Sequence, residues 1–290
     1  MKQLAMKQLI VTSDDFGASV FVNEAVELAH RAGTLTAASL MVSGEGAADA
    51  VARARTMPGL GVGLHLVLVD GRPALPPALI PNLVGPDGRF RNDMAMMGLE
   101  IFCRPKVRKQ LRAEITAQFE RFAQTGLPLD HVNLHKHFHL HPTISAQVIE
   151  IGVKFGMRAL RVPIEPHQII AQIEPHQNSL IDRVVASRAK ALRRRVRQTG
   201  YHAPDQVFGL VWSGAMTADR LRALLARLPE GITELYLHPA TQNTFTGSAP
   251  GYRYTEELDA LLDQGVKDAM NTPDIELLNF AGLPHHTVLA

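Results

Sequence analysis

Short apolar runs alternate with amphipathic segments along most of this chain. Continuous apolar runs of this length are typical of buried parallel strands, and the segments between them have the 3.6-residue apolar spacing of helices. The predicted strands cover residues 7–13, 37–42, 61–66, 129–134, 159–163, 207–211, 234–237 and 275–279. The predicted helices cover residues 19–31, 47–55, 107–125, 144–155, 179–199, 218–227 and 256–264. About seven βα units predict an α/β fold whose parallel sheet closes into a barrel, with residues 1–290 forming one domain.

Two segments interrupt this rhythm. Residues 67–104 are rich in Pro and Gly and are expected to be irregular, and a loop insertion of this length in a compact domain usually has a function. The sequence IEPHQ occurs at 164–168 and again at 173–177, which indicates a small local duplication in a loop.

Composition narrows the class of protein. The chain has 290 residues, of which 46% are hydrophobic and 20% charged, as in ordinary globular proteins, and its net charge of +2 argues against a nucleic-acid binder. Cys103 is the single cysteine, so a metal site would have to use His and carboxylate ligands. We expect a cytoplasmic protein, because no signal segment or membrane-spanning apolar run is seen. The opening MKQLA is repeated as MKQLI, which makes Met6 an alternative start.

Histidines are concentrated in residues 131–141, HVNLHKHFHLH. His135, His137, His139 and His141 occupy every second position, and alternate residues of an extended chain face the same way. Imidazole is a common ligand of divalent transition metals, so the segment predicts a metal site at a strand end. The alternatives are a surface tract that binds metal incidentally and a polar loop.

Other polar side chains lie where predicted strands end. In a parallel barrel the carboxyl ends of the strands carry the active site. The candidates at these ends are Asp14, Asp15, His65, His135, Arg161 and His238. Of the two adjacent carboxylates, one can bind a metal while the other acts as a base, although an aspartate here is also a common helix cap. Trp212 is a candidate lining of the substrate cleft, with core packing as the alternative.

Four motifs resemble the signatures of the YdjC-like carbohydrate deacetylases. They are TSDDFG (12–17), GLHL (63–66), NLHKHFH (133–139) and LHPA (237–240). That family is similar in fold to the polysaccharide deacetylases, an irregular barrel of β/α units. The segments at 23–42, 63–73 and 127–143 most resemble its hopanoid-biosynthesis-associated branch, HpnK.

This resemblance implies hydrolysis of the N-acetyl group of an N-acetylglucosamine-type sugar carried on a hopanoid lipid. It places a divalent metal, Mg²⁺ or Zn²⁺, on Asp15, His65 and His135. Asp14 then corresponds to the general base and His238 to the proton donor. For the mechanism we also expect Arg161 to orient a carboxylate near the metal. His137, His139 and Trp212 are the candidate substrate-binding residues. Lys136 is a departure, because many relatives have a histidine at this position of the His-rich motif.

Several alternatives stay open from the sequence. The enzyme could act on soluble chito-oligosaccharides such as diacetylchitobiose, hydrolyse phosphoesters or other amides on a similar barrel, or bind a metal or sugar without catalysis. The basic helix at 180–197 has Val184 on its expected apolar face, and its arginines form either a solvated surface or a contact with anionic lipid at the inner face of the membrane. Relatives suggest a homodimer.

Overall fold

The computed structural model describes residues 7–177 and 179–284. Residues 1–6, and with them the alternative start at Met6, lie outside this part of the chain. The described residues form one parallel sheet of seven strands. The strands are β1 (Lys7–Phe16), β2 (Ala37–Leu40), β3 (Gly61–Leu66), β4 (Val132–Leu134), β5 (Gln206–Phe208), β6 (Gly231–Leu237) and β7 (Ile275–Leu277). Their order is β4-β3-β2-β1-β6-β5, and β7 pairs with the start of β1.

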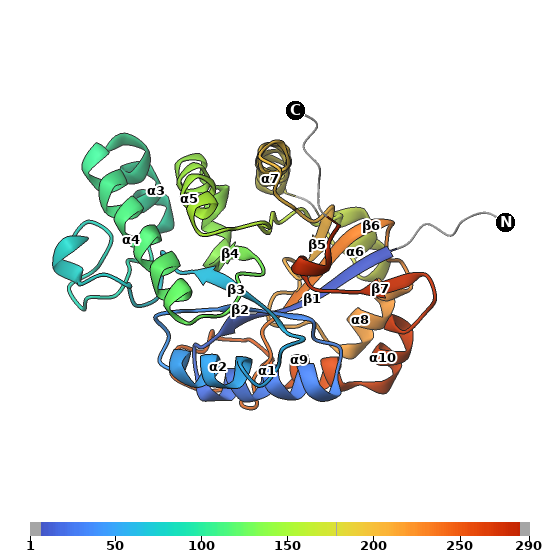
Figure 1. Cartoon of the computed structure of the whole chain (residues 1–290). Coiled ribbons are helices and arrows are strands. Elements are labelled where there is room, and N and C mark those ends of the chain that lie inside the picture. The colour runs from blue at the N-terminus through green and yellow to red at the C-terminus, as the bar shows by residue number, and fades with distance from the viewer. Residues whose placement is uncertain (1–6, 178, 285–290) are drawn as a thin grey trace.

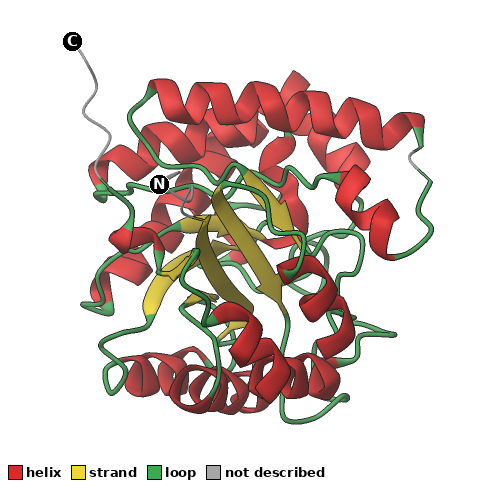
Figure 2. Cartoon of the chain, turned by 90° about the vertical axis from the view of Figure 1, so that its right-hand side faces the viewer, coloured by secondary structure: helices red, strands yellow, loops and turns green. Residues whose placement is uncertain are grey.

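Helices cover the sheet from both sides (Figures 1 and 2). One group consists of α1 (Val20–Ala32), α2 (Ala47–Ala54), α8 (Ala218–Leu225), α9 (Tyr254–Leu262) and α10 (Gln264–Met270). The opposite group consists of α3 (Met94–Cys103), α4 (Pro105–Gln124), α5 (Pro142–Lys154) and α7 (Leu180–Gln198). The shorter elements are α6 (His167–Ile173) and the 3₁₀ turns η1 (Pro77–Leu79), η2 (His135–Leu140) and η3 (Phe280–Gly282). The helices therefore bury both faces of the strands, as a parallel sheet requires.

The central strand β1 shows why the sheet is buried. Leu9, Ile10 and Val11 are completely inaccessible to solvent, so both faces of this strand pack into apolar surroundings. The polar residues Thr12, Ser13 and Asp14, which follow toward the carboxyl end of the strand, are also buried. An apolar strand that ends in buried polar residues places these side chains at the carboxyl edge of the sheet, where the active sites of such barrels lie.

Residues 158–164 close the gap between the two edge strands of the curled sheet. Val132 of β4 bridges to Leu160, and the main chain of Ala159 bridges to His202. The N–H of Val207 in β5 donates to the carbonyl of Ile164 at 2.9 Å. The predicted strand at 159–163 is therefore present only as isolated bridges, and the predicted irregular (β/α) barrel is confirmed.

Part of the expectation for residues 67–104 is wrong, because α3 forms near their end, over Met94–Cys103. The segment MAMMGLEIFC is apolar on nearly every side, so it has no polar face from which a helical period can be recognised. Sequence reading also missed the short helices α6 and α10. Val184 of α7 was expected on the buried face but is 63% exposed. Among the described residues, no helix combines the length and the apolar character needed to cross a bilayer.

Candidate metal centre and active site

A bulge at the end of β1 aims the side chain of Asp15. The pairing register of β1 with β2 shifts between Ser13 and Phe16, and Asp15 has a φ of 61°, in the left-handed region. Aspartate tolerates this conformation better than most residues, and bulges beside active sites commonly redirect a side chain. Gly17 follows with a φ of 92°, and a Cβ there would lie 3.1 Å from the carbonyl oxygen of Met41. The turn after the two aspartates therefore requires glycine.

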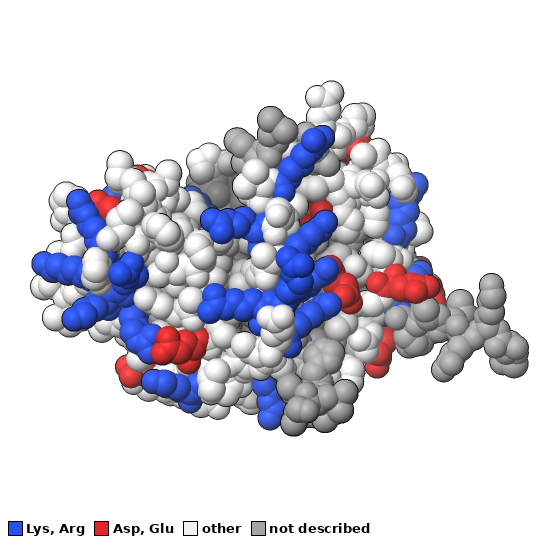
Figure 3. All heavy atoms as spheres, turned by 90° about the horizontal axis from the view of Figure 1, so that it is seen from above, with Lys and Arg blue, Asp and Glu red and all other residues white. Residues whose placement is uncertain are grey.

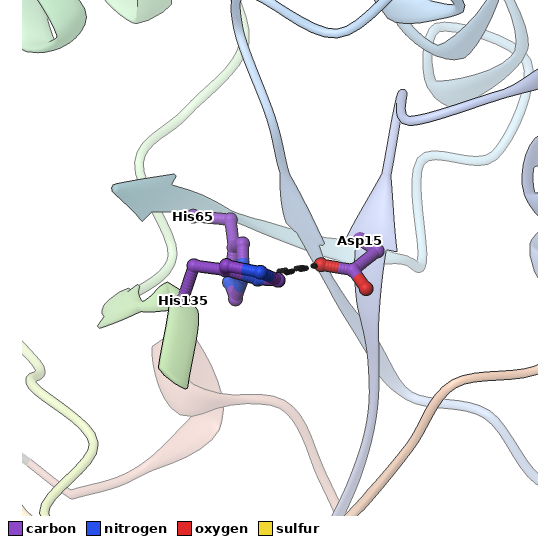
Figure 4. A group of neighbouring side chains, drawn as sticks. All are labelled: Asp15, His65 and His135. Carbon is purple, nitrogen blue, oxygen red and sulfur yellow. Dashed lines mark hydrogen bonds and ion pairs between the residues drawn. The ribbon is translucent and has the colours of Figure 1, made fainter. Parts of the chain in front are cut away.

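Asp15, His65 and His135 converge on one point (Figure 4). Asp15 Oδ1 lies 3.2 Å from His65 Nε2 and 3.3 Å from His135 Nδ1. The two imidazole nitrogens are themselves 3.3 Å apart. Ligand atoms that share an ion through bonds of about 2.1 Å lie roughly 3.0–3.4 Å from one another, so this near-equilateral triangle has the dimensions of one side of a metal coordination shell.

The chemistry of these three donors also fits a cation. His65 Nδ1 lies 2.7 Å from Asn133 Oδ1, a contact in which the imidazole donates, so the lone pair is on Nε2 and faces the other two ligands. Asp15 Oδ1 is buried and has no hydrogen-bond partner among the described residues. Burial raises the pKa of Asp15, but His135 and His65 outweigh this effect and hold the pKa well below its ordinary value. An anionic oxygen and imidazole lone pairs therefore face one common point, which is the requirement for binding a divalent ion.

Asp14 lies beside this triangle but is held by a different set of contacts. Its side chain is 3% exposed and accepts hydrogen bonds from Arg161 Nη1 at 2.5 Å and from Asn133 Nδ2 at 2.8 Å. Burial raises the pKa of Asp14, but the charge of Arg161, followed by those of His65 and His238, lowers it well below the ordinary value. Asp14 is therefore a carboxylate at any pH at which the protein would operate.

Arg161 is fully buried between two carboxylates. Besides Asp14, it donates from Nε and Nη2 to Glu234 Oε1, at 2.9 and 2.6 Å. Its guanidinium carbon lies 4.5 Å from the ring centroid of Tyr236, a cation–π contact. Thr12 adds a hydrogen bond to the same Glu234 oxygen at 2.9 Å. Arg161 thus binds Asp14, a carboxylate beside the ligand triangle, and Glu234 binds Arg161 on its other side.

His238 directly follows the last residue of β6. Its main-chain N–H donates to Glu257 Oε2 at 2.5 Å, which fixes the backbone at this strand end. Its ring packs edge-on against Tyr236 and Tyr252, with centroids 5.6 and 5.1 Å away. Only 9% of the residue is exposed. The imidazole is therefore held by packing at the edge of the site rather than by a salt bridge.

The expected extended run of histidines is wrong. After His135, Lys136 and His137 have φ values of 53° and 52°, and the chain turns into η2. Successive imidazoles then point to different places, because a left-handed turn destroys the two-residue period of a strand. His137 Nε2 lies 3.0 Å from the hydroxyl of Tyr236, whereas the fully buried His139 lies 2.8 Å from the carbonyl oxygen of Arg161. Only His135 joins the metal triangle.

A cavity of about 530 Å³ opens over these groups. Its lining includes Asp14, Asp15, His65, His135, His137, Tyr236 and His238. Lys136 and Asp70, which form an ion pair with each other, also line it. Trp212 and His139 are not among its lining residues. Trp212 is 5% exposed and packs under Arg220, whose guanidinium carbon is 5.1 Å from the ring centroid.

Sequence reading missed the residues that support the site. Asn133 contacts both Asp14 and His65, while Glu234 and Glu257 hold Arg161 and the main chain of His238. A polar residue inside an otherwise apolar strand was the available signal for Asn133 and Glu234. Their partners lie far away in sequence, so the contacts themselves could not be foreseen.

Comparison with known proteins places this site in a family. The family model described as YdjC-like protein matches residues 8–272. The chain belongs to the YdjC-like protein family. Its YdjC-like relatives include a carbohydrate deacetylase of Brevibacillus brevis, 31% identical over 279 residues that cover 95% of this chain and 99% of that protein. A chitooligosaccharide deacetylase of Enterobacter sp. (strain 638) is 31% identical over 281 residues, covering 96% of this chain and 99% of the relative.

The YdjC-like fold is also seen in a solved structure. A crystal structure of an Enterococcus faecalis V583 protein, described as a candidate cellobiose-phosphate cleavage protein, superposes with a TM-score of 0.73 at 23% identity. The match covers 96% of this chain and 98% of that chain. At this identity the likeness establishes the shared fold alone.

Proposed function

We propose that this protein is a divalent-metal-dependent hydrolase that removes the acetyl group from an N-acetylglucosamine-type sugar. The observation that carries the proposal is the triangle of Asp15, His65 and His135 at the floor of a cavity that Asp14 and His238 also line. Relatives named as carbohydrate and chitooligosaccharide deacetylases support it, since the chain aligns with them over nearly its full length.

A divalent ion held by the three ligands would polarise the acetamide carbonyl and acidify a water molecule. Asp14 takes the proton of the water as its oxygen bonds to the acetyl carbon. Because the pKa of Asp14 is so low, this carboxylate is always ionised but is a weak base, and it therefore needs an acidified water. Arg161 and Asn133 hold both carboxylate oxygens in place during this transfer.

The C–N bond breaks only if the departing nitrogen is protonated, because an amine anion is a very poor leaving group. His238 faces the cavity from the strand end next to Asp14 and supplies this proton. The products are acetate and the free amino sugar. His137 lines the same cavity and is a candidate contact for the sugar.

For the substrate, we propose an amino sugar carried on a hopanoid lipid. For the metal ion, we propose Mg²⁺ or Zn²⁺. The motif segments of the hopanoid-associated branch support the lipid, and the mixed oxygen and nitrogen ligands suit either ion. Incubation with N-acetylglucosaminyl bacteriohopanetetrol and with diacetylchitobiose tests the choice of substrate. Acetate release from the lipid-linked sugar alone supports it, whereas release from diacetylchitobiose alone points to soluble oligosaccharides.

Removal of the metal is expected to abolish acetate release. Dialysis against a chelator should leave less than about 1% of the activity, because Asp14 is too weak a base to activate bulk water. Acetate is measured before and after titration with Mg²⁺ or Zn²⁺, with phosphate release from a sugar phosphate as the control reaction. Full activity in metal-free protein, or phosphate release in place of acetate, would contradict the proposal.

Replacement of His238 by Gln is expected to lower turnover about 10²-fold on an N-acetyl sugar. The loss should be much smaller on 4-nitrophenyl acetate, whose leaving group needs no proton. Metal content should be unchanged, because His238 is outside the ligand triangle. An equal loss of kcat on both substrates would show that His238 does not act as the acid.

A further inference from the structure

The outer face of α3 exposes three large apolar side chains. Met96, Leu99 and Phe102 are 53%, 57% and 60% exposed, and their spacing of three residues puts them on one side of the helix. The same helix buries Met97 and Ile101 against the rest of the protein. A continuous exposed apolar stripe of this kind usually marks an interaction site.

An apolar groove runs between this stripe and the segment that follows η2. Its volume is about 450 Å³, and it is lined by Leu99, Phe102, Phe138, His141 and Arg188 among others. Phe138 belongs to η2, whose first residue, His135, is one of the three candidate metal ligands. The groove therefore shares a turn of the chain with the candidate metal centre.

Helix α7 borders the groove with an excess of positive charge. Arg188 lies in the groove lining itself, and Val184, at 63% exposure, adds an apolar side chain to this surface. The exposed basic residues of α7 include Arg183, Arg188, Lys190, Arg194 and Arg195. Asp182 is the one acidic residue of the helix. Within the described part of the chain, no ion pair neutralises these five cations.

The apolar stripe and the cations lie on one side of the molecule. Figure 1 shows α3 and α7 in the same helix group, opposite α1 and α2. Figure 3, which views this side from above, shows basic side chains spread across it between uncharged regions. This surface thus combines side chains that prefer the acyl boundary of a bilayer with side chains that prefer anionic headgroups.

We propose that this surface docks on a bilayer containing anionic phospholipids. The docking face consists of Met96, Leu99, Phe102 and Val184 together with the five exposed cations of α7. Long basic side chains beside an apolar stripe suit a bilayer, because the aliphatic stems cover apolar surface while the charges reach the headgroups. The docking inference rests on the proposed function in one respect. Docking would bring the cavity to a membrane-anchored sugar substrate.

Flotation with phospholipid vesicles tests the docking face. The wild-type protein should bind vesicles of equimolar phosphatidylcholine and phosphatidylglycerol at low salt, bind phosphatidylcholine alone at least about tenfold more weakly, and lose most binding at high salt. Leu99→Ser/Phe102→Ser and Arg194→Glu/Arg195→Glu should each reduce binding about tenfold or more. The matched controls, Leu28→Ser on α1 (46% exposed) and Arg227→Glu after α8, should bind as wild type.

Acetate release and sedimentation distinguish a failure of the docking face from a failure of the proposed hydrolase. All four variants change exposed residues away from the cavity and should release acetate from a soluble substrate at the wild-type rate. Vesicle binding without any acetate release would refute the proposed hydrolase and still support the docking face. Absence of binding to anionic vesicles, or equal loss in the control variants, would overturn it. A dimer in sedimentation that Leu99→Ser/Phe102→Ser dissociates would also overturn it, by assigning the stripe to a second copy of the chain.

Discussion

An Asp14→Asn enzyme is expected to lose about 10²–10⁴-fold in turnover while it keeps its metal. The amide cannot accept the proton of the attacking water. Asp14 is not part of the ligand triangle, which Asp15, His65 and His135 form without it. Acetate release measures the loss of turnover, and the metal content of the same preparation shows whether the ion is retained.

The matched control is Asp15→Asn, at the neighbouring carboxylate. This change removes the anionic ligand, so it should lower metal affinity at least about tenfold and lose activity because the ion is lost. Excess metal should then restore part of the activity of Asp15→Asn but none of the activity of Asp14→Asn. Full turnover in Asp14→Asn would exclude it as the base.

Replacement of Arg161 by Met is expected to give the largest loss of stability, about 3–5 kcal/mol in the free energy of unfolding. Arg161 has no exposed surface, and its removal leaves the carboxylates of Asp14 and Glu234 buried without their cation. Urea denaturation measures the loss. The double variant Arg161→Met/Glu234→Gln should recover part of it, because one of the two stranded charges is then absent.

The loss in Arg161→Met should also depend on pH. In the wild type the pKa of Asp14 is held below its ordinary value of 3.8, so its stabilisation is complete above that value and decreases as pH falls through it. The variant lacks this contribution. The difference in unfolding free energy should therefore be constant above about pH 5 and narrow as the pH falls below 3.8. A difference that stays constant, or widens toward acid, would show that Arg161 does not stabilise the ionised Asp14.

The strand-end pattern predicted that Asp14, Asp15, His65, His135, Arg161 and His238 gather at one edge of the sheet, because parallel strands place their carboxyl ends together. The choice of Asp15, His65 and His135 as metal ligands came from the resemblance to the YdjC-like family. The positions of His137 and His139 could not be predicted in the same way. The directions of these two side chains depend on the left-handed turn at Lys136. The pattern of hydrophobic and polar residues does not indicate that a lysine adopts this conformation.

The residues that contact Asp14 and Arg161 show a second limit of prediction from the sequence. Asn133 and Glu234 are visible as polar residues in buried strands, but their roles depend on contacts with Asp14 and Arg161 that lie more than 70 residues away. Helix α3 was missed for a different reason. Its residues are apolar on the exposed side as well as on the buried side, so the amphipathic period that identifies most helices is absent.

Residues 158–164, which close the gap between the edge strands, also hold Asp14, the carboxylate proposed as the base. In this part of the barrel wall, isolated bridges replace regular strand pairing, and the same residues include Arg161. His139 ties the carbonyl of Arg161 to η2, the same turn that begins with His135. Local opening of the barrel wall at these residues would displace the guanidinium of Arg161 together with the carboxylate of Asp14 that it binds. The position of the proposed base would then depend on the stability of a wall segment outside the cavity.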